Sequence, residues 1–316
     1  DVKSTTDGAT ALMWAAQNGH TEVVSLLLDG GADVRVKNIS NKASALWIAA
    51  AKGHVDIVGL LIQKDAKVND KTSSGDIDLL WAKQIGEEEP EAGEITIFQV
   101  LRLLDKIEMN TGATTIIDEL RDLVEYQESE GITARDGGTA LWIAAQKGHA
   151  DVVRLLIENG ASVNAKNLAG TTALWVASRN GHMDVARILL ENGAKVNTET
   201  AEFTTALWIA ASEGHADIVR LLIEYGAEVN TAKVNATNLL DCTPALWVAA
   251  QKGHAEVVAL LVQNGAWVNY RDRDGTTAFW IALDNGHTMI ARFLLENGAN
   301  VNVDDDALEQ TPLMMA

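Results

Sequence analysis

Residues 170–197 read GTTALWVASRNGHMDVARILLENGAKVN, and this stretch predicts two short helices separated by a tight turn. Thr172 suits the N-cap of the first helix, because its hydroxyl can accept an early backbone N–H. Leu174 and Ala177 then share one helix face, whose small residues allow a neighbouring helix to pack closely. Gly181 ends this helix, since glycine tolerates the positive φ that the turn requires.

The second helix of the stretch is amphipathic and also ends at a glycine. Val185, Ile188 and Leu189 fall on one face of it. Gly193 stops the helix before Ala194-Lys-Val-Asn leads the chain towards the next unit. Two helices this short cannot bury their apolar faces alone, so neighbouring units must complete the core.

The same pattern recurs along nearly the whole chain. The leading apolar residue of the first helix recurs at Leu12, Leu46, Leu79, Leu141, Leu174, Leu207, Leu246, Phe279 and Leu313. Most steps are 33 or 34 residues, the length of one helix-turn-helix unit plus a β-turn. Units also share Gly-His before the second helix and Gly-Ala-x-Val-Asn after it. The chain therefore resembles the ankyrin-repeat family, with about eight to nine units.

This resemblance implies an all-α fold, an ankyrin-repeat solenoid of stacked helix-turn-helix units with β-turn fingers. Residues 1–70 hold repeats 1 and 2, and residues 137–316 continue the repeats to a truncated C-terminal unit. We expect one continuous stack of helix pairs, interrupted only at 71–136 and 231–241, where the 33-residue register is lost.

Residues 71–136 differ in kind from their surroundings. They hold 16 acidic and 6 basic side chains, so more than half of the chain's net charge of −19 lies here. Glu87–Glu94 replaces the Gly-His turn, and two helices are predicted over Ile95–Ile107 and Thr114–Glu128. The segment is either one enlarged unit or two degenerate repeats with an acidic helical insertion. Its acidic loop is either a solvated turn or a contact for a basic partner.

A second insertion, of six residues, lies within 231–241 and should lengthen a β-turn finger. Leu239 and Leu240 are apolar where turns are usually polar. They either fold back onto the array or form an exposed contact.

Tryptophan occupies a position where the ankyrin family usually has histidine. The family motif Thr-Pro-Leu-His becomes Thr-Ala-Leu-Trp or a close variant, with the indoles at Trp47, Trp142, Trp175, Trp208, Trp247 and Trp280. Burying an indole removes about 150–250 Å² from water, so we favour a structural ladder packed between units. The alternative is an aromatic surface that receives side chains of a partner.

The sequence offers no clear chemistry. All seven histidines follow a glycine at the same position of their units. If units lie about 8–10 Å apart, equivalent imidazoles are too distant to share a zinc ion. Cys242 has no spare histidine to act as its base, and no nucleotide-binding or hydrolase motif is present. We therefore predict no enzymatic activity, no cofactor and no metal.

Composition favours an intracellular, cytoplasmic protein without membrane insertion. A net charge of −19 disfavours contact with nucleic-acid phosphates. A single cysteine cannot form an internal disulfide. No apolar run approaches the roughly 18–20 residues that a membrane span requires.

The ankyrin resemblance implies that another protein binds the concave groove, which is formed by the β-turn tips and the exposed side of the first helices. The two residues before each Gly-His turn belong to this surface. The candidate partner-binding residues are Lys52, Gln146, Lys147, Arg179, Asn180, Glu213, Gln251, Lys252 and Asp284, with Leu239 and Leu240 of the second insertion. This row carries four basic and two acidic residues, the inverse of the chain as a whole. A partner that presents polar and acidic groups would suit it.

The leading interpretation is a protein–protein interaction scaffold. The alternatives are a regulatory ankyrin domain of a larger enzyme or channel, and a structural subunit of a multiprotein assembly. The pattern is cut off at Met315 and Ala316, which favours a fragment of a longer chain, because a terminal unit should present a polar cap to water.

Overall fold

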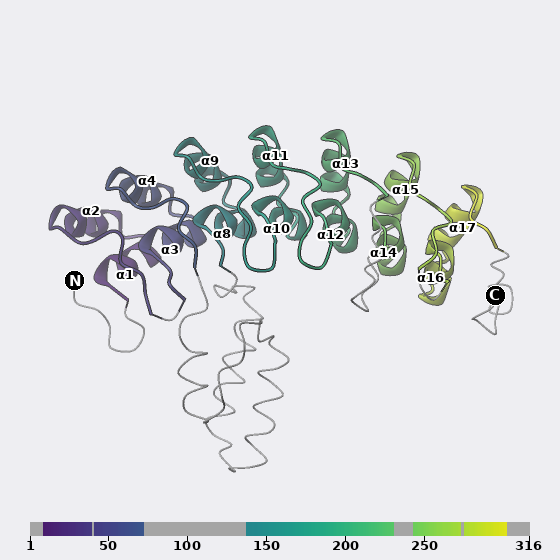
Figure 1. The fold of residues 1–316 in the computed structure, drawn as a ribbon, viewed down its shortest axis with the longest axis horizontal. Coiled ribbons are helices and arrows are strands. Elements are labelled where there is room, and N and C mark those ends of the chain that lie inside the picture. Colours follow the sequence, from purple (N-terminus) through teal and green to yellow (C-terminus); the bar gives the residue numbers. More distant parts are fainter. Residues whose placement is uncertain (1–8, 40, 73–136, 231–242, 273–274, 302–316) are drawn as a thin grey trace, which may run out of the picture.

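The computed structural model describes residues 9–39, 41–72, 137–230, 243–272 and 275–301. These residues form seven pairs of α-helices and no β-strand, so the predicted all-α class is confirmed for them. The first helices of the pairs, labelled as in Figure 1, are α1 (Ala11–Gln17), α3 (Ala45–Lys52), α8 (Ala140–Lys147), α10 (Ala173–Arg179), α12 (Ala206–Glu213), α14 (Ala245–Lys252) and α16 (Ala278–Asp284). The second helices are α2 (Thr21–Asp29), α4 (Val55–Gln63), α9 (Ala150–Glu158), α11 (Met183–Glu191), α13 (Ala216–Glu224), α15 (Ala255–Gln263) and α17 (Thr288–Glu296).

Hydroxyl side chains set the start of most first helices. In six of the seven described first helices, the N-cap hydroxyl accepts the backbone N–H three residues ahead, at 3.2–3.3 Å. These caps are Thr10, Ser44, Thr139, Thr172, Thr205 and Thr277. Pro244 stands before α14 and makes no such bond. The local sequence is therefore sufficient to place these helix starts.

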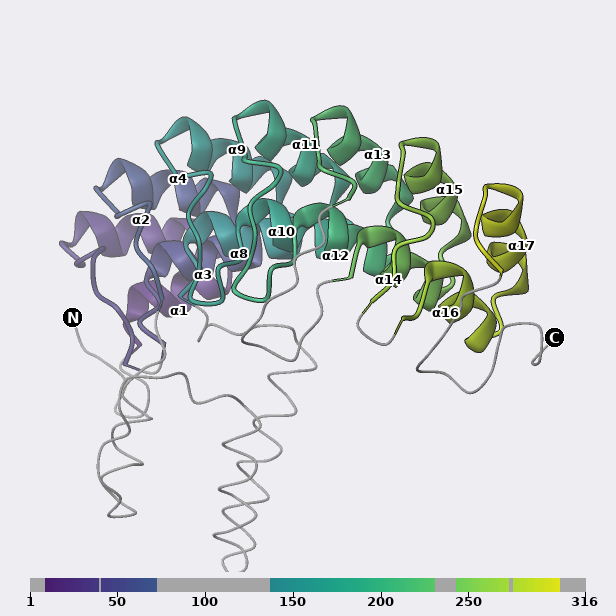
Figure 2. The same cartoon turned by 45° about the vertical axis from the view of Figure 1, so that its right-hand side comes forward.

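The helix pairs stack into one curved array (Figures 1 and 2). Each first helix packs against the first helix of the next described pair, and the second helices form a parallel outer row. The first helices and the fingers lie along the inner, concave edge. Leu141 and Leu174 of the first helices, with Leu156 and Leu189 of the second, are almost fully buried between the rows. This shared core supplies the burial that no single pair achieves alone.

The stack is continuous across both insertions, so the two expected interruptions are absent. Helix α3 packs directly on α8, and α4 on α9, although residues 73–136 separate them in sequence. Helices α12 and α14, as well as α13 and α15, contact each other in the same way across residues 231–242. Both insertions enter the chain after a second helix, at the finger, where extra residues do not have to part the helix layers.

The structural predictions made for most of 71–136 lie outside the described residues. They include the acidic loop Glu87–Glu94, the two predicted helices and the division into one or two degenerate repeats. The same applies to Leu239 and Leu240 of the second insertion. The truncated last unit falls within 302–316 and is also not described.

An asparagine from the closing Val-Asn motif clamps each of five units to the next. Asn164 Nδ2 donates to the Gly193 carbonyl at 3.0 Å, while its Oδ1 accepts the Lys195 N–H at 2.8 Å. The same pair of bonds is made by Asn69, Asn197, Asn230 and Asn269. Arg35 stands at this position in the first unit. There, an ion pair of 3.1 Å between Lys64 and Asp29 joins the ends of α4 and α2.

The N-terminal end of the array presents apolar side chains. Trp14, Val23 and Leu26 of the first pair are 54%, 45% and 72% exposed. In register, Trp14 corresponds to Ile143 and Val23 to Val152, both fully buried by the preceding pair. The first pair therefore has the side-chain pattern of an inner unit.

Candidate protein-binding surface

The nine predicted first-helix residues lie along the concave edge. They stand near the C-terminal ends of six first helices, α3, α8, α10, α12, α14 and α16. We call them the first-helix row: Lys52, Gln146, Lys147, Arg179, Asn180, Glu213, Gln251, Lys252 and Asp284. Six members are exposed, whereas Gln146, Lys147 and Gln251 are partly buried. The structure thus brings these residues into one line. It gives no position for Leu239 and Leu240, which lie outside the described residues.

Histidines hold the backbone of this row in place. His182 Nε2 lies 2.9 Å from the Gln146 carbonyl oxygen of the preceding unit, and His215 Nε2 lies 3.0 Å from that of Arg179. The same contact is made by His54, His149, His254 and His287 to the carbonyls of Gln17, Ala51, Ser212 and Gln251. Six of the seven histidines therefore link neighbouring units and fix the turn that presents the row.

In six of the seven described units, the glycine before the histidine leaves room for the next unit's imidazole. Gly148 has φ +78°, and a Cβ at this position would lie only 2.7 Å from Nδ1 of His182. Glycine is needed here both for the left-handed backbone and for the close approach of the ring. Gly-His is thus one inter-unit joint. Within the described residues, no group of three or more His, Cys, Asp or Glu is placed to hold a metal ion.

The tryptophan row is mainly a packing element in the described units. Trp47 and Trp142 are buried, and the other four members are half-buried. The indole N–H of Trp142 donates to Thr171 Oγ1 of the next unit at 3.0 Å. Trp175 and Trp208 make the equivalent bond to Thr204 Oγ1 and to the Thr243 carbonyl. Such contacts between units favour the structural ladder over an aromatic partner surface.

Trp47 faces a gap in this ladder. The position that corresponds to Thr171 in the unit after Trp47 is Gly138, which has no hydroxyl. The buried Nε1 of Trp47 has no hydrogen-bond partner, and neither does that of Trp247. The ladder is therefore complete at only some of the joints between described units.

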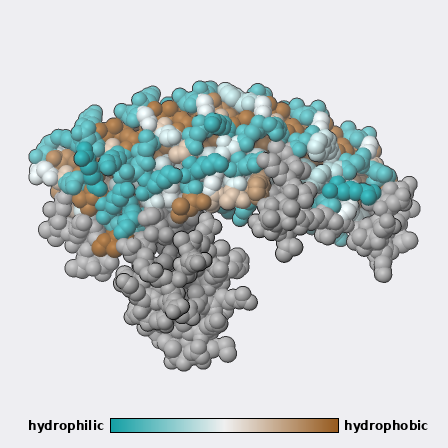
Figure 3. Space-filling view, viewed as in Figure 1, coloured by the Kyte–Doolittle hydropathy of each residue, from teal (hydrophilic) through white to brown (hydrophobic). Residues whose placement is uncertain are grey.

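Charge is divided between the two helix rows. The seven described second helices carry 11 acidic and 4 basic residues, whereas the first helices carry 2 acidic and 4 basic residues. The first helices therefore carry a net positive charge and the second helices a net negative charge, as the sequence predicts for the first-helix row. Bands of hydrophilic side chains run across the face shown in Figure 3.

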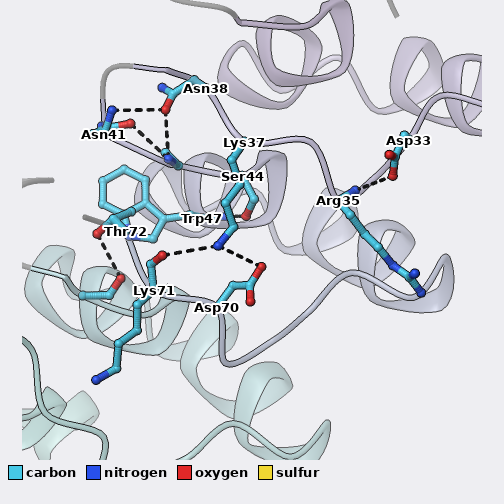
Figure 4. Close-up of polar contacts among 12 residues, drawn as sticks. Asp33, Arg35, Lys37, Asn38, Asn41, Ser44, Trp47, Asp70, Lys71 and Thr72 are labelled. Carbon is cyan, nitrogen blue, oxygen red and sulfur yellow. Dashed lines mark hydrogen bonds and ion pairs between the residues drawn. The ribbon is translucent and has the colours of Figure 1, made fainter. Parts of the chain in front are cut away.

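Three lysines on successive fingers were not anticipated. Lys37 Nζ donates to the Lys71 carbonyl at 3.5 Å, and also pairs with Asp70 at 3.1 Å (Figure 4). Lys71 Nζ donates to the Lys166 carbonyl at 2.6 Å, and Lys166 Nζ to that of Glu199 at 2.9 Å. We call Lys37, Lys71 and Lys166 the finger lysines. The sequence does contain a pattern that could have identified them, because each stands three residues after the valine of the closing motif.

Two apolar side chains on the fingers were also missed. Ile39 is 52% exposed and Leu168 is 63% exposed, and each follows a finger lysine by two residues in the sequence. Both are single residues within polar turns, so hydrophobic periodicity could not single them out. They add apolar contact area to an otherwise charged part of the concave edge.

Comparison with known proteins agrees with this geometry. A family model described as ankyrin repeats (3 copies) matches residues 1–72, 109–200, 168–233, 197–266 and 231–305. The chain belongs to the ankyrin-repeat family. Ankyrin repeats are generally protein–protein interaction modules. Searching curated proteins by sequence returns no significant match.

Solved structures support the same fold. The ankyrin chain is similar to the crystal structure of the human ASB11 ankyrin repeat domain, with a TM-score of 0.64 and 21% sequence identity. The match covers 92% of this chain and 99% of the other. At this identity the likeness concerns the fold alone. Among the described residues, no helix of the ankyrin array has the length and apolar character needed to cross a membrane.

Proposed function

We propose that this ankyrin array is a protein-interaction scaffold whose partner binds the concave edge, through the first-helix row and the finger tips. In this role the protein acts inside the cell, without catalysis, a cofactor or a metal. The observation that carries the proposal is the inverted charge of the first helices in a chain with a net charge of −19.

Rigidity of the row supports this proposal. The histidine contacts fix the backbone at Gln146 and Arg179, and the asparagine clamps fix the bases of the fingers. A surface that is ordered before binding loses less conformational entropy when a partner docks. The side chains at the tips of these turns, such as Asn180 and Glu213, remain exposed for contact.

Site-specific photo-cross-linking tests the location. A benzoylphenylalanine residue replaces Asn180 or Glu213 on the concave edge, and in matched controls replaces the exposed Arg154 or Arg187 on the second helices. We expect protein adducts from the concave positions, and few from the controls. Adducts confined to Arg154 and Arg187 would place the partner on the convex side and refute the proposal.

A further inference from the structure

We propose that the partner presents an acidic segment, and that this segment docks on only one end of the concave edge. This inference rests on the proposed function. We call this part the basic end, namely α1, α3, α8 and α10 with fingers 30–44, 64–72 and 159–172. The acidic end comprises α12, α14 and α16 with the described residues of fingers 192–205, 225–244 and 264–277.

The two ends carry opposite charge. The first helices and described fingers of the basic end sum to +7, whereas those of the acidic end sum to −3. At the basic end the carboxylates are Asp33, Asp65 and Asp70, and Asp70 already pairs with Lys37. The acidic end instead has Glu199, Glu202, Glu213, Glu228, Asp272 and Asp284. Among the described residues, which leave out 73–136 with its net charge of −11, the basic end therefore attracts an acidic ligand and the acidic end repels it.

The positive charges of the basic end form two adjacent lines. Lys52 and Lys147 stand at the same register position of consecutive described helix pairs, and Arg179 stands one position earlier in the next pair. The finger lysines stand on three successive fingers. Each donates a hydrogen bond to a carbonyl of the next finger, and these bonds fix the positions of the three ammonium groups. Neighbouring stacked helices lie about 8–10 Å apart. The screening length is about 8 Å at physiological salt, so adjacent charges act together on a ligand.

The side chains of this end suit carboxylates. The Arg179 guanidinium lies 5.9 Å from the centroid of the Trp175 ring, one turn earlier on α10. This stacking orients a planar fork that can bind a carboxylate through two hydrogen bonds. The exposed Ile39 and Leu168 on the fingers could receive apolar residues of the same segment. A peptide that alternates acidic and apolar residues therefore fits better than a long polyanion, which the −19 net charge would repel.

A binding experiment on the full chain tests this assignment. The probe is a fluorescently labelled short peptide of alternating glutamate and leucine, with a lysine–leucine peptide of the same length as the reference. The test variant is the double substitution Lys52→Glu and Arg179→Glu. The matched control is the double substitution Arg154→Glu and Arg187→Glu, which makes the same change in net charge at exposed arginines of the second helices α9 and α11. Circular dichroism and thermal melting establish that each variant is folded.

We expect the test variant to bind the glutamate–leucine peptide about tenfold more weakly, and the control variant to bind it within about twofold of the original chain. Equal loss in both variants, or no binding by the original chain, would overturn the inference. Cross-linking at Asn180 distinguishes failure of the acidic-partner inference from failure of the proposed scaffold function. If adducts form there but charge reversal at the basic end leaves their yield unchanged, the scaffold function stands and the acidic-partner inference falls. If no adducts form on the concave edge, the proposed function itself falls.

Discussion

Thr72 and Gly138 are 66 positions apart in sequence, yet the backbone N–H and the hydroxyl of Thr72 both donate to the Gly138 carbonyl at 3.2 Å. Asn69 joins the same two units through the Gly160 carbonyl at 3.0 Å and the Ser162 N–H at 2.7 Å. The chain therefore leaves and rejoins the solenoid at one finger. The helix pairs on either side meet as any other neighbours do.

Shortening this finger should preserve the array. Residues 73–136 are replaced by Leu-Ala, the pair that stands between Asn167 and Gly170 in a regular finger. With 64 residues removed and two added, Leu46 and Leu141 would lie 33 positions apart, one repeat period. We expect cooperative unfolding and a free energy of unfolding up to about 2 kcal/mol higher, because a shorter loop costs less entropy to close. Chemical denaturation measures it, and loss of a cooperative transition would show that the array depends on the removed segment.

Substitutions of two glycines should separate backbone strain from crowding. Gly148 and Gly160 both have φ near +80°, but only Gly148 has an imidazole where a Cβ would lie. We expect Gly160→Ala to cost about 1–2 kcal/mol for the left-handed backbone alone. Gly148→Ala should cost about 1–3 kcal/mol more, since His182 must move. Denaturation midpoints measure both, and equal losses would contradict the role assigned to the Gly-His joint.

The indole bond between units can be isolated by a double-mutant cycle. Trp142→Phe and Thr171→Val each remove one partner of the 3.0 Å hydrogen bond, so we expect a coupling energy of about 0.5–1.5 kcal/mol between them. Trp47→Phe paired with Thr171→Val is the control, because the Trp47 N–H has no partner. Coupling of the same size in the control would mean that packing, and not the hydrogen bond, links the sites.

The free energy of unfolding lost when a tryptophan is replaced with alanine should increase with the burial of its indole. Trp142→Ala should cost about 3–5 kcal/mol, the range for deleting a buried aromatic side chain. Trp175→Ala should cost less, because this indole is only half-buried. Unchanged melting of Trp142→Ala, together with weaker partner binding, would instead assign the row to the interface.

Removal of one asparagine clamp should loosen a single joint. Asn164→Ala deletes two hydrogen bonds to the next unit, so we expect a loss of about 1–3 kcal/mol. Arg35→Ala changes the same register position in a unit without the clamp, and should cost less than about 0.5 kcal/mol. Hydrogen exchange of α10 and α11 should rise in the Asn164 variant, and an unaffected exchange rate there would contradict the clamp.

The sequence by itself determined the repeat, the helix pairs and the line of candidate binding residues. Caps such as Thr172 and turns such as Gly181-His182 depend on neighbours within one unit, so a period of 33 residues was sufficient to predict them. The same reasoning placed Lys52, Lys147 and Lys252 at one register position, because similar units stack in a similar way.

Only the tertiary structure decided which units are neighbours and where the charges gather. That α3 packs on α8 depends on contacts between residues far apart in sequence, which the helical period does not contain. The finger lysines join the surface through contacts between fingers, such as the hydrogen bond from Lys71 Nζ to the carbonyl of Lys166. Charge is read along a sequence one residue at a time, whereas a binding surface is formed by residues that stacking brings together from separate units.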